Sequence, residues 1–132
     1  MTTDTQEEDR RRHIDGFVDS FVRPEKRERY REFLLNPKKR RRFVDRLNHK
    51  MVGDLIAKHI VTKPPHSSLD AVAYLISDER EIDNRFVEAE RACELVAGAH
   101  FGTIASFIPG VLVAFKEEAP AAVLWLHRGE SK

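Results

Sequence analysis

The sequence contains a single cysteine, Cys93, among its 132 residues. One cysteine excludes an intramolecular disulfide framework and any zinc site built from paired cysteines. A chain with so little cysteine suits a reducing compartment, and we expect the protein to be cytoplasmic. The first thirteen residues are strongly charged and contain no apolar core, so they do not resemble a secretory signal or an acid-poor transit peptide.

Long hydrophobic runs are also lacking. The longest uncharged apolar stretch extends from Gly102 to Phe115, and the Pro109-Gly110 pair interrupts it. A membrane-spanning helix needs about 18 to 20 apolar residues, so we expect no membrane partner. The length and the 41% hydrophobic content predict one domain over residues 1–132, with residues 1–8 and 129–132 as frayed ends.

Motifs that hold cofactors or metals are absent from the sequence. Neither G-x-G-x-x-G nor G-x-x-x-x-G-K-[ST] occurs, so dinucleotide and P-loop sites have no support. No two of the six histidines have the i, i+4 spacing that lets them share a metal on a helix. The acidic stretch from Asp78 to Asp83 lacks the glycine and the final glutamate of a calcium loop. We therefore predict no cofactor and no metal.

A nucleophilic enzyme would need a serine or cysteine beside a histidine and a carboxylate. The sequence has no G-x-S-x-G elbow, and Cys93 lies on the packed face of a predicted helix, where it is a small core residue. The two candidate serines fall on predicted strands. We predict no catalytic residue and favour a non-enzymatic domain that acts through binding, although a triad could draw on Ser77, Ser106, Cys93, His100, His127 and Asp78.

Charge is present in abundance but is unevenly distributed. Residues 1–50 contain 15 Lys and Arg against 10 Asp and Glu, whereas residues 51–132 contain 8 against 12. The net charge of +1 therefore divides into halves of about +5 and −4. Between Arg23 and Lys50 the basic residues number 12 and the acidic residues 4.

The basic half has helical periodicity. Apolar residues from Asp9 to Val22 fall on one stripe, which predicts a first helix. Pro24 can open a second helix that ends at Asn36-Pro37, and Pro37 can open a third with Asn36 as its cap and Gly53 as its stop. Residues 9–52 are therefore predicted to be a helical basic region with about three helices.

The remainder of the chain, residues 67–128, favours a sheet. Residues 71–77 fit either a helix or a buried strand, and we favour the strand because the run is short and rich in β-formers. A helix is predicted over 84–97, followed by strands over 103–108, 111–116 and 122–127, with Pro109-Gly110 as the centre of a type II turn. The fold class is α+β: a helical layer and then a β-α-β-β-β segment that forms a mainly antiparallel, four-stranded sheet.

The last strand lacks polar alternation over residues 123–126. An apolar strand at a sheet edge needs cover from a helix or another subunit, so we suspect a homodimer or other homo-oligomer.

The five consecutive cations at the start of the third predicted helix are the strongest candidate site. Backbone N–H groups already carry partial positive charge there, so the cations are electrostatically misplaced unless they meet an anion. A phosphate ligand or nucleic acid is one candidate. Another is that the basic region from residue 23 to 50 faces acidic residues of the same chain or of a second protomer, such as Asp78, Glu79, Glu81, Glu88 and Glu90. The simplest alternative is a solvated helix face. The candidate anion-binding residues are Lys38, Lys39, Arg40, Arg41 and Arg42.

Overall fold

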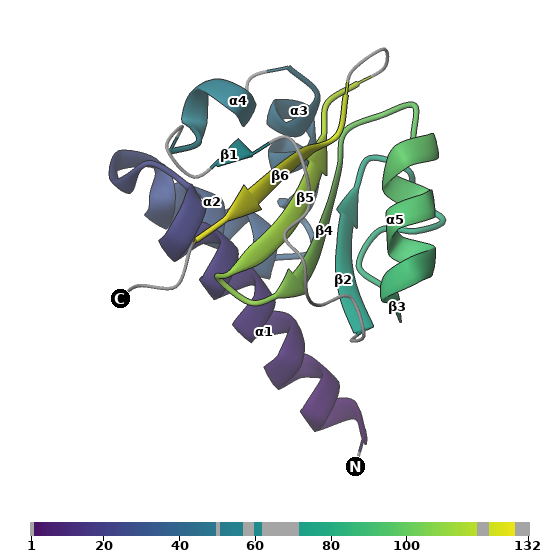
Figure 1. The fold of residues 1–132 in the computed structure, drawn as a ribbon. Helices are drawn as coiled ribbons and strands as arrows, with labels where there is room; N and C mark the ends of the chain where they lie inside the picture. Colours follow the sequence, from purple (N-terminus) through teal and green to yellow (C-terminus); the bar gives the residue numbers. More distant parts are fainter. Residues whose placement is uncertain (1, 50, 57–59, 62–71, 119–121, 129–132) are drawn as a thin grey trace.

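The computed structural model describes residues 2–49, 51–56, 60–61, 72–118 and 122–128 (Figure 1). Residues 67–71 of the predicted sheet region and the predicted frayed end at 129–132 lie outside these ranges. No helix within the described ranges is both long enough and apolar enough to cross a membrane.

The chain first forms a helical layer and then a sheet, which confirms the predicted α+β class. The helical layer comprises α1 (Thr2–Phe21), the short 3-10 helix η1 (Pro24–Lys26), α2 (Arg27–Leu35), α3 (Arg40–His49) and α4 (Met51–Asp54). The strands are β1 (Ile60–Val61), β2 (Val72–Ser77), β3 (Phe86–Glu88), β4 (Thr103–Ile108), β5 (Leu112–Lys116) and β6 (Leu124–His127), with α5 (Ala89–Gly98) between β3 and β4.

Within the described residues the sheet has six strands in the order β1-β6-β5-β4-β2-β3, and every neighbouring pair is antiparallel. The prediction of four strands was wrong in number because β1 and β3 are too short to leave a pattern in the sequence. The edge position on which the suspicion of a homo-oligomer depended is not present in the described part of the sheet. β6 lies between β1 and β5 within the described residues, so the cover for its edge comes from β1 of the same chain.

The helical layer follows the predicted stripe, with small shifts at the helix starts. α1 already begins at Thr2, and the apolar residues of the predicted stripe, from Ile14 in α1 to Val22 just after it, are buried. The chain after Pro24 makes a 3-10 turn before α2, and α3 begins at Arg40 rather than at Pro37. The prediction that Asn36 caps this helix was therefore wrong: its side-chain oxygen accepts a hydrogen bond from the Lys38 N–H at 2.9 Å, which forms a turn ahead of α3.

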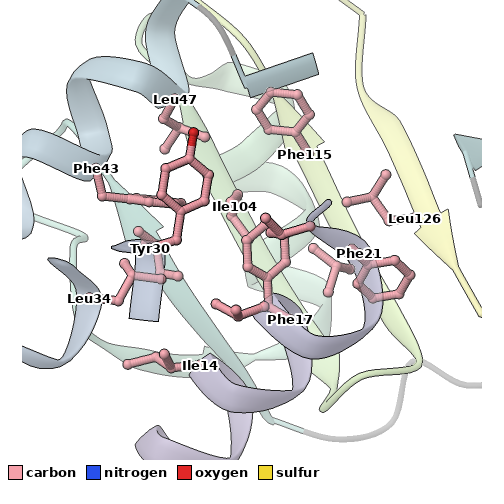
Figure 2. Close-up of a cluster of buried hydrophobic side chains, with 14 of the residues drawn as sticks. Ile14, Phe17, Phe21, Tyr30, Leu34, Phe43, Leu47, Ile104, Phe115 and Leu126 are labelled. Carbon is pink, nitrogen blue, oxygen red and sulfur yellow. The ribbon is translucent and has the colours of Figure 1, made fainter. Parts of the chain in front are cut away.

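Both faces of the sheet are apolar, and alternate residues of each strand face opposite sides. One face packs against the helical layer, where Ile104, Phe115 and Leu126 meet the aromatic residues of α1 to α3 (Figure 2). The other face carries Leu75, Phe107 and Trp125, with α5 packed against it over β2, β4 and β5 (Figure 1). The central strands are therefore buried on both sides, which explains why their sequences are mostly apolar.

The predicted helix over 84–97 is only partly correct. Residues 86–88 form β3, which pairs with β2, and the helix starts at Ala89. Asn84 has a φ of +63°, its N–H donates to the Leu75 carbonyl, and the Leu75 N–H donates to the Arg85 carbonyl. This is the pattern of a β-bulge of the G1 type, with asparagine in the place usually held by glycine.

Candidate functional site

Arg40, the middle residue of the basic run, is buried and paired within the chain. Its Nε lies 2.8 Å from Oδ2 of Asp83, and its Nη2 lies 3.0 Å from Oδ1. The guanidinium also donates to the Leu34 carbonyl and stacks 5.7 Å from the centre of the Tyr74 ring. Burial alone lowers the pKa of Arg40, but its hydrogen bond to the Asp83 carboxylate holds that pKa above its ordinary value.

Asp83 reaches this position because the segment after β2 turns back on itself. Its Oδ1 also accepts the Ser77 N–H at 2.8 Å, which fixes the carboxylate against the end of β2. The first turn of α3 thus meets a carboxylate of the sheet region, an anion supplied by the chain itself.

The two cations that flank Arg40 in the sequence also meet carboxylates. Arg41 lies 2.9 Å from Oδ1 of Asp78, which confirms the predicted pairing of the basic region with that residue. Lys39 lies 2.6 Å from Oε2 of Glu32 on α2, and this contact lowers the pKa of the Glu32 carboxyl. The two arginines therefore tie α3 to the sheet region, whereas Lys39 ties the start of α3 to α2.

Lys38 and Arg42 are exposed and form no ion pair with any residue that the structure describes. Arg42 lies beside a groove of about 710 Å³ between α2 and α3. Lys39 and Phe33 also line this groove, and Arg29 contributes a second exposed guanidinium from α2. The structure therefore divides the predicted site: Arg40 and Arg41 face the sheet region, and Lys39 and Arg42 face the groove.

The groove carries charge of both signs. Arg29, Lys39 and Arg42 supply three cations, and Glu28 and Glu32 supply two carboxylates. Lys39 is paired with Glu32, and the charge of Arg42 also acts on that carboxylate, so the cations of the groove without a direct ion pair to a described residue are Arg29 and Arg42. Arg29 and Phe33 were not predicted as site residues. Their i, i+4 spacing on α2 places them on one face, but only the packing of α3 beside α2 turns that face into a groove.

The candidate nucleophiles are held in structural contacts. Ser77 Oγ lies 2.8 Å from Thr103 Oγ1, and Ser106 Oγ lies 2.7 Å from His13 Nδ1. Both serines are at most 2% exposed, so a substrate has no path to their hydroxyls. Half-buried Cys93 has its thiol pKa raised by burial and by two neighbouring glutamates, which disfavours the reactive thiolate.

His13 is the nearest histidine to a candidate serine, and sequence reasoning did not select it. Its ring packs against Tyr74 of β2 and Phe86 of β3, on the face of the sheet that α1 covers. Burial and the adjacent Arg12 charge lower its pKa to about 4, so the ring is neutral at pH 7. In the part of the chain that the structure describes, no three histidine, cysteine or acidic side chains gather as a metal site.

Comparisons of the chain with protein-family models, with curated proteins and with solved structures found no match. The assignment of function therefore depends on the geometry of the groove and its charges.

Proposed function

We propose that the protein is a binding domain that takes a phosphate-bearing ligand in the groove between α2 and α3. The observation that carries this proposal is the pair of exposed arginines, Arg29 and Arg42, on two helices that face one groove. The single cysteine suits a reducing compartment, and we propose the cytoplasm as the place of action.

The anchoring of α3 supports this proposal. Arg40 and Arg41 fasten the first turn of the helix to Asp83 and Asp78, so the next residue, Arg42, projects from a fixed backbone. A backbone that is already fixed reduces the conformational entropy that Arg42 loses when it binds, and its planar guanidinium fits two phosphate oxygens at once.

The rest of the lining limits the ligand. Glu28 and Glu32 reduce the net charge of the groove to +1, so a broad duplex backbone would meet repulsion as well as attraction. Phe33 offers an apolar ring beside the arginines. We therefore expect a single strand or a small phosphate compound to bind better than a duplex, because a flexible strand can place its phosphates at the arginines.

Fluorescence anisotropy with labelled single-stranded DNA and RNA, measured from about 50 mM salt upward, tests the proposal. We expect the Arg29→Ala/Arg42→Ala variant to bind more weakly and to reduce the slope of log affinity against log salt by about 2. The matched control is Arg11→Ala/Arg91→Ala, which removes the same charge from exposed positions on α1 and α5. Titration with pyrophosphate shows whether a small ligand suffices.

Equal affinity of the groove variant and the control variant for both oligonucleotides and pyrophosphate would overturn the proposal. So would the absence of binding to all of these probes at about 50 mM salt, where phosphate contacts are strongest.

A further inference from the structure

A second groove lies on a different part of the molecule, between α1 and the edge strand β3. Its volume is about 440 Å³. Gln6, Glu7 and Arg10 line it from α1, and residues 84–87 line it from the bulge and the strand. It shares no residue with the groove between α2 and α3.

Among the strands that the structure describes, β3 is the last in the sheet order, with β2 as its neighbour on one side. The Leu75 N–H bonds to the Arg85 carbonyl, and the register then places Val87 opposite Ala73. Because alternate residues of an antiparallel strand direct their backbone groups to opposite sides, the N–H and C=O of Phe86 point away from β2. This edge can therefore accept another extended chain.

The groove also presents side chains that suit a peptide. Gln6 and Asn84 are exposed amides, and Asn84 Oδ1 already accepts the Tyr74 hydroxyl at 2.7 Å, which leaves its NH₂ group to donate. Arg85 is exposed and makes no ion pair with any described residue, whereas Arg10 is paired with Glu7. The charge at this end of the groove therefore favours a carboxylate.

We propose that an extended segment of a partner protein binds along β3 as an added strand, with an acidic side chain placed at Arg85. Backbone hydrogen bonds to Phe86 supply affinity, and the Arg85 ion pair sets the register and the charge preference. A second copy of this chain fits less well, because its own β3 edge would bring a second Arg85 and Arg10 to the same place.

Two labelled five-residue peptides test the inference: Thr-Val-Glu-Val-Thr and the same peptide with lysine in place of glutamate, both with blocked ends. We expect the glutamate peptide to bind, with amide NMR shifts confined to residues 84–88 and to the first half of α1. Arg85→Glu is expected to reverse the preference between the two peptides, whereas Arg91→Glu, a reversal at an exposed site on α5, leaves it unchanged. N-methylation of the backbone amides of the glutamate peptide is expected to abolish binding.

Three results would overturn the inference. The first is no binding of the glutamate peptide at about 1 mM. The second is equal binding of the N-methylated peptide, and the third is self-association of the protein with NMR shifts at β3. Because the two grooves share no residue, loss of phosphate binding leaves this inference standing, and failure of the peptide leaves the proposed function standing.

Discussion

Gly16 of α1 and Gly110 of the β4–β5 turn meet where the helix crosses the sheet. A Cβ built on Gly16 would lie 2.5 Å from the Gly110 nitrogen and 2.8 Å from the Pro109 carbonyl carbon, distances that no side chain tolerates. Gly110 has a φ of +74°, and the Val111 N–H donates to the Ile108 carbonyl at 2.9 Å. These two values confirm the predicted type II turn. Both glycines are required for the helix to lie this close to the turn.

Substitution of Gly110 by valine is expected to lower the free energy of unfolding by about 1 to 3 kcal/mol, because a β-branched residue at positive φ is strained. The new Cβ would also lie 3.1 Å from the Ser20 hydroxyl. Urea denaturation measures the change. Gly98→Ala is the control, because nothing lies within 4 Å of its added Cβ. A cost below about 0.5 kcal/mol for Gly110→Val would contradict the strain argument.

His13 makes the stability of the fold depend on pH. Its pKa is about 4 in the folded protein and about 6.5 in an unfolded chain, so the unfolded state binds the proton first as the pH falls. The stability contributed by the neutral ring is complete above about pH 6.5 and is lost on acidification towards pH 4, by an amount on the order of 3 kcal/mol. Arg12 adds to this shift, and Asp9 opposes it.

Urea denaturation of the wild type and of His13→Gln between pH 7 and pH 4 isolates this contribution, because glutamine can still bond to Ser106 but does not titrate in this range. We expect the wild type to lose more stability than the variant over that interval. If the free energies of unfolding of the two proteins fall in parallel with pH, the pKa of His13 is not lowered in the folded protein.

At the scale of elements, two ion pairs of unequal burial fasten α3 to the segment after β2. The Arg40 and Asp83 side chains are 10% and 21% exposed, whereas Arg41 is 62% exposed. Removal of one partner from a buried pair leaves an uncompensated charge, which costs about 3 to 5 kcal/mol. An exposed pair contributes about 0 to 1 kcal/mol.

We therefore expect Arg40→Ala to destabilise the protein by about 3 to 5 kcal/mol, with little dependence on salt. For Arg41→Ala we expect a loss of about 0 to 1 kcal/mol that shrinks further at high salt. Chemical denaturation with urea at low and high salt compares the two. Similar losses for both variants would show that burial does not separate the pairs. Arg40 is accordingly unsuitable as a probe of ligand binding.

The elements that the sequence predicts well are those whose evidence is local. The stripe of α1, the strand at 103–108 and the Pro109-Gly110 turn all depend on neighbouring residues, and the structure confirms them. β3 was missed because Phe86 continues the helical spacing of the residues in α5, and only its pairing with Tyr74 makes it a strand. β1 has two residues and exists through its pairing with β6.

For the whole molecule, the fold partly offsets the separation of charge along the sequence, because it brings basic residues of the first half against acidic residues of the second half. The basic helical region meets the acidic segment after β2 through Arg40 and Arg41, and Arg31 meets Asp15 and Asp19 within the helical layer. Sequence reasoning located the basic run and one acidic partner, Asp78. It could not divide the run between two faces, because Arg40 and Asp83 are 43 positions apart.

The position of β6 in the interior of the sheet determines when the fold can be completed during synthesis. β1 precedes β2 in the chain, yet it joins the sheet through β6, and Arg128 reaches back to the Ser20 hydroxyl on α1 at 3.0 Å. Leu126 and Trp125 also complete the two apolar clusters. Until residues 124–128 have left the ribosome, Phe17 and Phe21 of α1 therefore lack part of the apolar surface that covers them. The nascent chain then exposes hydrophobic side chains to which chaperones can bind.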